Sequence, residues 1–330
     1  RMGVLAGFLG TMLIGSYMAL SGTLEVGSYS VLVFLTQRFL WPFTTLSTLI
    51  DDFERTMAST KRIFNMMNVD RKIKNIDSPH FLNDCKADIS FHNVGFSYDD
   101  QKPLFEDFNL SIPFGSSIGI VGDTGSGKTT IAKLLLRLYD TNKGKITIGD
   151  HPLNTIDISF LRKRIGIVNQ SPFLFNATIK DNIGYGLKNL TMNEIENAAN
   201  QSQATEFIEK LPKGFDTIVG ERGQMLSGGQ QQRIAIARTV VRNPDIIIFD
   251  EATSSVDNKT EQLIQKALFN IQKGRTSIII AHRLSTIRNC STIFLIKDGK
   301  VVEKGNHESL INDGNSYYSQ LWDIQTGKKN

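Results

Sequence analysis

A glycine-rich segment, residues 122–129, has the residue types and spacing of a phosphate-binding loop. Its sequence GDTGSGKT fits the pattern GxxxxGK[ST], and it lies between an apolar strand and a helix, as this pattern requires. The glycines let backbone N–H groups curl inward toward phosphate oxygens, and the helix N-terminus favours an anion. Lys128 is placed to reach the β- and γ-phosphates, and Thr129 to put its hydroxyl on Mg²⁺. The segment predicts a nucleotide site built from Gly122, Asp123, Thr124, Gly125, Ser126, Gly127, Lys128, Thr129 and Thr130.

Two acidic residues follow a second apolar run. Asp250 and Glu251 come directly after the sequence IIIF at 246–249. At the carboxyl end of a parallel strand, both side chains emerge beside the ligand crevice. We expect Asp250 to hold Mg²⁺ through water, because Mg²⁺ keeps several waters, and Glu251 to accept a proton from an attacking water. Without the phosphate-binding loop, an exposed acidic turn or a helix cap would be the better interpretation.

A second candidate anion site lies in the signature segment, residues 226–230. Its sequence LSGGQ precedes an amphipathic run, and a serine with two glycines at a helix start is typical of an anion site. One nucleotide cannot readily use both helix starts if they lie on separate lobes of one chain. The second site therefore needs an explanation beyond a single chain.

With the signature segment, the chain resembles the ATP-binding cassette (ABC) superfamily, and specifically its half-transporter exporters. Further matches come in the family's order. Tyr98 in FSY resembles the A-loop aromatic, Gln170 in VNQSPFLF the Q-loop, and VGERG at 219–223 the X-loop of exporters. SSVD at 254–257 resembles the D-loop, and His282 in AHR the H-loop. The resemblance covers 88–325 densely.

This resemblance implies roles on the nucleotide's own side of the site. Tyr98 would stack on adenine, which suits a flat aromatic face. Gln170 would touch Mg²⁺ or the attacking water and report to the membrane domain. His282 would contact the γ-phosphate and orient Glu251. Without the resemblance, Tyr98 would be an ordinary strand aromatic, Gln170 a surface amide and His282 a capping or packing residue.

The resemblance also implies a second subunit. Two cassettes would dimerise head to tail, most simply as a homodimer, with each ATP between one phosphate-binding loop and the partner's signature segment. Asp257 would help to join the cassettes, and Glu221 would contact the coupling loops of the membrane domain. The signature residues implied to grip the partner's ATP are Ser227, Gly228, Gly229 and Gln230.

Three positions depart from the family pattern. Asp123 and Thr124 stand where many exporters carry Pro and Ser, and Val256 stands where Leu is usual. The loop also ends KTT rather than KST. None of these changes removes a backbone donor or the hydroxyl for Mg²⁺, so we expect an active cassette.

The start of the chain predicts membrane helices. Residues 2–20 carry no charge and are long enough to cross a hydrocarbon core about 30 Å thick. The alternative for this first stretch is a buried core helix. A second span is expected at about 29–50, although Gln37, Arg38 and Pro42 interrupt it, so that Arg38 would snorkel or the span would be shifted. The turn at 21–28 has no Lys or Arg, whereas six follow between 55 and 74, which places the turn outside and both ends inside.

These observations predict an α/β nucleotide-binding domain, with a mixed sheet and a helical subdomain, preceded by two transmembrane helices. We expect the end of a membrane domain at 1–69, a linker at 70–87, the cassette at 88–325 and a frayed tail at 326–330. Strands are predicted at 116–121, 245–249 and 277–281, and the helix after the phosphate-binding loop should carry Ile131, Leu134, Leu135 and Leu138 on one face. A half-transporter would have six membrane helices, so the chain is expected to be a fragment.

Composition excludes several classes of protein. Of 330 residues, 40% are hydrophobic and 21% charged, which excludes a disordered chain. The net charge of +4 with no long basic block gives no nucleic-acid footprint. The two cysteines, Cys85 and Cys290, cannot form a disulfide framework or a four-ligand zinc site.

The predicted function is ATP hydrolysis coupled to export of an unidentified substrate across a membrane, with ATP and Mg²⁺ as ligands. The bacterial inner membrane is the expected location, with the cassette in the cytoplasm. The alternatives are a soluble ABC ATPase that acts on DNA or ribosomes, an importer ATPase, and a channel or regulator that uses ATP as a switch. The apolar stretch 2–50 argues against the first two.

Overall fold

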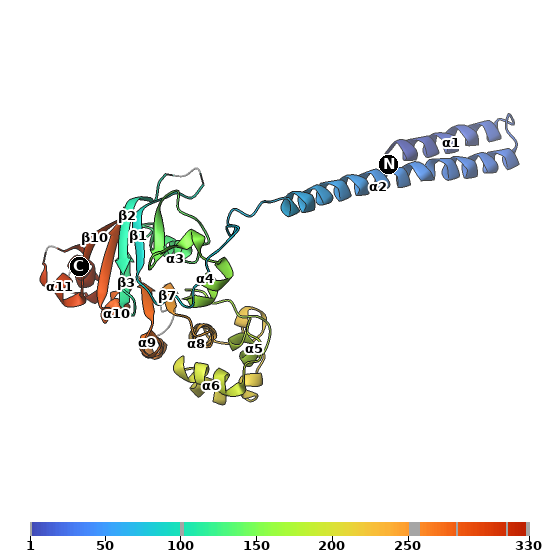
Figure 1. Ribbon diagram of the computed structural model, residues 1–330. Coiled ribbons are helices and arrows are strands. Elements are labelled where there is room, and N and C mark those ends of the chain that lie inside the picture. The colour runs from blue at the N-terminus through green and yellow to red at the C-terminus, as the bar shows by residue number, and fades with distance from the viewer. Residues whose placement is uncertain (1, 100–101, 251–257, 282, 315, 328–330) are drawn as a thin grey trace. The chain divides into compact units, whose positions relative to one another are not determined.

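The computed structural model describes residues 2–99, 102–250, 258–281, 283–314 and 316–327. The chain divides into two compact units, Arg1–Arg71 and Lys72–Asn330 (Figure 1). Each unit has its own internal packing, and the residues predicted to bind nucleotide all belong to the second.

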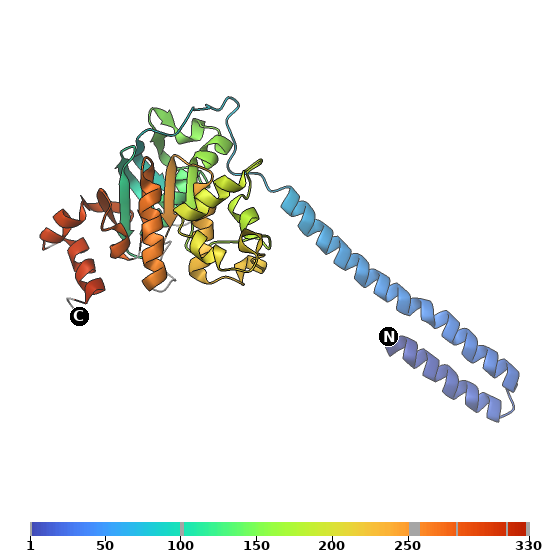
Figure 2. The ribbon, with the colours of Figure 1, turned by 90° about the horizontal axis from the view of Figure 1, so that it is seen from below.

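The first unit is a helical hairpin. Helix α1 (Met2–Leu20) lies along the first part of α2 (Val26–Met67), as Figures 1 and 2 both show. The Tyr29 hydroxyl and Ser16 Oγ join the two helices at 2.8 Å. Most large apolar side chains of this hairpin are exposed. In the part of the chain that the structure describes, Gly3–Leu20 alone is long and apolar enough to be a candidate span.

The second predicted span falls within α2. This helix continues without interruption through Pro42 and on to Met67, so it includes the mixed-charge stretch after residue 50. The span at about 29–50 does not meet the criterion that Gly3–Leu20 meets, and it stays a prediction.

The second unit alternates strands and helices. Its strands are β1 (Ile89–Phe96), β2 (Phe105–Ile112), β3 (Ser117–Gly122), β4 (Lys143–Ile148), β5 (His151–Pro152), β6 (Ile165–Val168), β7 (Ile246–Asp250), β8 (Thr276–Ile280), β9 (Thr292–Lys297) and β10 (Lys300–Gly305). Its α-helices are α3 (Lys128–Leu135), α4 (Ile158–Arg164), α5 (Ile179–Ile183), α6 (Met192–Gln201), α7 (Thr205–Glu209), α8 (Gly228–Val240), α9 (Asn258–Gln272), α10 (Leu284–Ile287), α11 (His307–Asn312) and α12 (Tyr317–Thr326). Short 3₁₀ helices are η1 (Leu153–Thr155), η2 (Gly214–Asp216) and η3 (Glu221–Gly223).

Two sheets form the framework of this unit. The larger has six strands in the order β10-β9-β3-β8-β7-β6, parallel except for β10. The smaller is antiparallel, with the order β2-β1-β4-β5. Helices α5, α6 and α8 gather into a helical subdomain (Figure 1). The predicted class, a mixed sheet with a helical subdomain, is confirmed.

The parallel sheet separates two hydrophobic cores. Successive residues of β7 and β8 point to opposite faces, because side chains alternate along a strand. One core takes Ile131, Leu134 and Leu135 of α3, together with Ile246, Ile248, Ile278 and Ile280. The other takes Ile234, Ile236, Ala237 and Val240 of α8, together with Ile247, Phe249, Ile279 and Ala281. The helix that follows the phosphate-binding loop and the helix that follows the signature segment therefore pack on opposite faces of one sheet.

The prediction that Leu138 shares one helical face with Ile131, Leu134 and Leu135 is wrong. Helix α3 ends at Leu135, and Arg137 takes a left-handed backbone conformation with φ 48°. That turn removes Leu138 from the helical face, and its side chain is 47% exposed. The periodic pattern extends beyond the residue where the helix stops.

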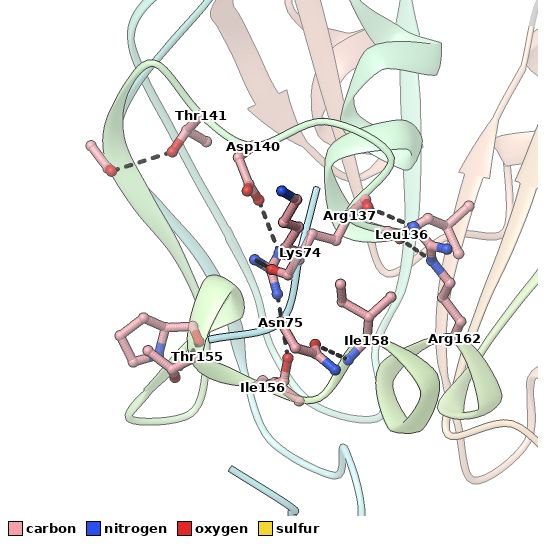
Figure 3. Close-up of polar contacts among 12 residues, drawn as sticks. Lys74, Asn75, Leu136, Arg137, Asp140, Thr141, Thr155, Ile156, Ile158 and Arg162 are labelled. Carbon is pink, nitrogen blue, oxygen red and sulfur yellow. Dashed lines mark hydrogen bonds and ion pairs between the residues drawn. The ribbon is translucent and has the colours of Figure 1, made fainter. Parts of the chain in front are cut away.

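The linker segment, residues 70–87, is attached to the second unit from Lys72 onward, whose Nζ donates to Asp99 Oδ1 at 2.6 Å. Arg137 is buried and donates to the Lys74 carbonyl at 3.0 Å, and Asn75 Oδ1 accepts from the Ile158 N–H at 3.0 Å (Figure 3). Farther along, the His80 N–H donates to the Thr155 carbonyl at 2.8 Å. A stretch with the composition of a loop is thus bound along its length to the domain that follows it.

Candidate functional site

The phosphate-binding loop joins β3 to α3 through backbone shapes that favour glycine. Gly127 is the N-cap of α3 with φ 103°, and a Cβ there would lie 2.5 Å from the Phe105 ring. At Gly122, φ is 154° and a Cβ would lie 1.9 Å from the Ile296 carbonyl oxygen. Among the described residues, the buried Ser126 hydroxyl has no hydrogen-bond partner. The loop is a tight cradle with an unused hydroxyl, which fits a phosphate group.

Lys128 places its charge inside this loop. Its Nζ donates to the carbonyl oxygens of Gly122 and Asp123, both at 2.8 Å, and its side chain is 5% exposed. A buried ammonium needs polar partners, and the curled backbone supplies two of them. The positive charge is therefore held beside the N–H groups of the loop and the N-terminus of α3, where all three favour an anion.

Thr129 and Asp250 meet at the carboxyl edge of the parallel sheet. Thr129 Oγ1 donates to Asp250 Oδ1 at 3.3 Å, across 121 positions of sequence. The register explains this contact, because β3 and β7 both run parallel to β8 and so end at the same edge. A hydroxyl beside a carboxylate is a donor set of the kind that Mg²⁺ prefers. The predicted metal residues Thr129 and Asp250 are brought together.

Gln170 follows β6, whose carboxyl end lies at the same edge of the sheet. Its side chain is exposed. The neighbouring Asn169 carbonyl accepts a hydrogen bond of 3.1 Å from Gln232 of α8. The segment that carries Gln170 is thus tied to the signature helix, and the role of Gln170 toward Mg²⁺ and the membrane domain stays a prediction.

Tyr98 lies just after β1, against the phosphate-binding helix. Its hydroxyl is hydrogen-bonded to Thr130 Oγ1 at 2.9 Å. Its half-buried ring packs edge-on against Tyr139, with centroids 5.1 Å apart, and Lys133 Nζ lies 5.4 Å from its centroid. Tyr98 and Thr130 are therefore in contact, and the stacking of Tyr98 on adenine stays a prediction.

The signature segment forms the capped start of α8. Ser227 Oγ accepts from the Gln230 N–H at 3.3 Å, and Gln230 Oε1 accepts from the Ser227 N–H at 2.9 Å, which is a reciprocal capping box. A Cβ at Gly229 would lie 2.1 Å from Thr260 of α9, so only glycine fits there, whereas Gly228 has open space around it. The Gln230 side chain thus orders the helix start, and Ser227 and Gly228 are exposed.

Several predicted residues have no described geometry. Glu251, Asp257, Val256 and His282 lie outside the described residues, so their roles stay predictions. Glu221 is described: it is exposed at the start of η3.

One contact to the phosphate-binding loop was not predicted from the sequence. The Tyr317 hydroxyl, at the start of α12, donates to both carboxylate oxygens of Asp123, at 3.0 and 3.2 Å. The two residues are 194 positions apart, and no pattern in the sequence links them.

Comparisons with known proteins agree with this geometry. Residues 105–254 match the family model described as ABC transporter. The chain is 41% identical over 317 residues to a toxin RTX-I translocation ATP-binding protein of Actinobacillus pleuropneumoniae, covering 96% of this chain and 45% of the relative. It is also 41% identical over 308 residues to an ATP-dependent lipid A-core flippase of Photorhabdus laumondii, covering 93% of this chain and 52% of the relative.

A solved structure has the same fold. A bacterial Atm1-family ABC exporter with ATP bound superposes with a TM-score of 0.76 at 35% identity, covering 98% of this chain and 56% of the exporter chain. The chain spans about half the length of these curated relatives and of this exporter.

Proposed function

We propose that this chain, whose residues 105–254 form an ABC transporter domain and whose relatives are ABC exporters, is the ATP-hydrolysing part of an ABC exporter. The observation that carries the proposal is the 3.3 Å contact between Thr129 and Asp250, next to a phosphate-binding loop that encloses Lys128. A phosphate cradle and a magnesium donor pair at one sheet edge are the two parts that phosphoryl transfer needs.

The chain's own residues would bind and orient the triphosphate. Lys128 and the N–H groups of the loop would hold the β- and γ-phosphates, while Tyr98 would provide a flat face for the adenine. Glu251 would take the proton from the attacking water, and His282 and Gln170 would orient the water and the γ-phosphate. Most of the catalysis would come from positioning and charge rather than from covalent chemistry.

Thr129, Asp250 and Gln170 are the residues that would hold Mg²⁺. When bound, the metal would neutralise charge that develops on the β- and γ-phosphate oxygens. The hydroxyl and carboxylate oxygens present here fit this hard cation better than a soft metal.

The similarity to exporters supports a proposal for the rest of the transporter. We propose that α1 and α2 belong to a membrane domain and that the second unit lies in the cytoplasm. A second ABC subunit, in the simplest case another copy, would supply the signature segment for each ATP. The two relatives at 41% identity are named for a toxin and for a lipid, so the shared sequence reflects the ATP-driven step rather than one cargo.

Two substitutions separate binding from hydrolysis. In the full chain purified in detergent, Glu251→Gln should lower ATP turnover by about 10²–10⁴-fold and leave ATP affinity largely unchanged, because it removes only the base. Lys128→Ala should weaken ATP binding itself. The matched controls are Glu196→Gln and Lys163→Ala, which change exposed side chains on α6 and α4. Wild-type turnover in Glu251→Gln would refute its assignment as the base, and unchanged affinity in Lys128→Ala would refute the phosphate role.

A further inference from the structure

Asp123 places a carboxylate in the phosphate-binding loop, close to where a triphosphate would bind. Its side chain is exposed, and both its oxygens accept from the Tyr317 hydroxyl. Its backbone carbonyl accepts from Lys128 Nζ at 2.8 Å, so this residue belongs to the cradle itself. A negative charge beside the polyphosphate is unfavourable unless something holds it in a fixed direction or offsets it.

Tyr317 is held in place by the start of α12. Glu303 of β10 accepts from the backbone N–H groups of Tyr317 and Tyr318, at 2.5 and 3.1 Å. Ser316 caps the helix by accepting from the Ser319 N–H at 2.9 Å. Lys297 Nζ lies 4.9 Å from the centroid of the Tyr317 ring. The phenol therefore approaches Asp123 from a fixed backbone.

The far end of α12 is anchored as well. Gln325 Oε1 accepts from the Leu284 N–H, the first residue of α10, at 2.9 Å. The buried Tyr318 contributes to the same core as Leu284 and Ile287. A helix fixed at both ends keeps the Tyr317 hydroxyl at one distance from the loop.

We propose that Tyr317 is a positioning residue for the phosphate-binding loop, which holds the Asp123 carboxylate in one direction so that the loop binds the triphosphate without opposing it. This inference rests on the proposed function, because it concerns nucleotide affinity at the same loop. This positioning role requires a carboxylate at position 123, so it applies only to a phosphate-binding loop that carries an acid there.

The hydroxyl is suited to this role at physiological pH. Its hydrogen bond to Asp123 raises the pKa of Tyr317 above the ordinary value for tyrosine. The phenol therefore stays protonated and remains a donor throughout the neutral range.

A double-mutant cycle on nucleotide affinity tests the proposal. The dissociation constant of a non-hydrolysable ATP analogue is measured by calorimetry for the wild-type chain, Tyr317→Phe, Asp123→Ala and the double variant. Tyr317→Phe should weaken binding about three- to tenfold when Asp123 is present, and less than about twofold when Asp123 is Ala, because contacting residues are coupled. Tyr185→Phe, which removes the hydroxyl of a half-exposed tyrosine between α5 and α6, is the control and should not change affinity.

The outcomes are distinguishable. If Tyr317→Phe keeps the wild-type affinity, or loses affinity equally in both backgrounds, the proposal is overturned. A lower melting temperature with unchanged affinity would mean that Tyr317 has only a structural role, and this also overturns it. If the wild-type chain does not bind the analogue at all, the proposed function fails instead.

Discussion

At the scale of single residues, Cys290 is expected to make the free energy of unfolding depend on pH. The side chain lies in the core that contains α8, and burial raises the pKa of its thiol to about 11, although the Ser117 hydroxyl donates to Sγ at 3.7 Å and lowers it slightly. The folded state keeps this proton when the unfolded chain has lost it. Its contribution to stability is therefore complete below about pH 8.5 and is lost as the pH rises toward about 11.

We expect the free energy of unfolding to fall by about 2–3 kcal/mol more in the wild-type chain than in Cys290→Ala over this range. Denaturant titrations at a series of pH values, followed by tryptophan fluorescence, measure the difference. Comparison with Cys290→Ala isolates this thiol, because both chains retain Cys85 and the same lysines and tyrosines. Parallel curves for the two chains would show that the thiol ionises in the folded state.

Residues whose chemistry depends on neighbours in the sequence were predictable. The phosphate-binding loop, Asp250 and the signature segment are local patterns next to apolar runs, and the structure joins Thr129 to Asp250 as parallel topology requires. Tyr317 was not predictable, because its contact to Asp123 depends on how α12 packs after the whole sheet has formed. The reciprocal cap of Ser227 and Gln230 is local as well, because a serine followed three residues later by glutamine is a typical pattern of a helix start.

At the scale of elements, the buried strands were predictable from the sequence, whereas the end of helix α3 was not. Buried runs such as IIIF predict β7 and β8 because strands covered on both faces are apolar throughout. The apolar pattern runs past the end of α3, because Arg137 takes a left-handed backbone conformation there. Arg162 of α4 then caps the end of the helix by donating to the Leu136 and Arg137 carbonyls, at 3.0 and 2.8 Å. The pattern of apolar residues carries no information about such a cap.

The hydrogen bonds of Arg137 hold the linker segment against the second unit. Besides the Lys74 carbonyl, its guanidinium contacts the Ile156 carbonyl at 3.5 Å and Asp140 at 3.0 Å. Arg137→Ala should destabilise the second unit by about 2 kcal/mol, because hydrogen bonds from a buried charged group are lost. Amides in peptides covering 72–87 should then exchange faster in hydrogen–deuterium exchange. Arg71→Ala, at an exposed position, is the control, and equal exchange in both variants would contradict the prediction.

At the scale of the whole molecule, the two candidate anion sites stand on helices packed on opposite faces of one sheet. This arrangement suits two chains that share each nucleotide. We expect Glu251→Gln with ATP and Mg²⁺ to sediment as a dimer, because the nucleotide would persist at the junction.

The space around Gly228 supplies a precise control for that dimer. A Cβ at Gly228 would meet nothing within 4 Å in a single chain, so we expect Gly228→Arg to fold normally and to bind ATP normally. Added to Glu251→Gln, it should prevent dimers, because the new side chain would occupy the partner's approach. Dimers that form equally well with and without Gly228→Arg would place the shared site elsewhere.

The attachment of the linker segment has a consequence for exchanging modules between related transporters. Asp245, which is buried, accepts from the Cys85 N–H at 3.0 Å, and Arg164 donates to the Asn83 carbonyl. A chimaera joined at position 88 would place a linker segment from another protein against Asp245, Arg164 and Arg137. A junction near position 72 keeps the linker segment together with the domain to which it is bound, so recombination there preserves all of these contacts.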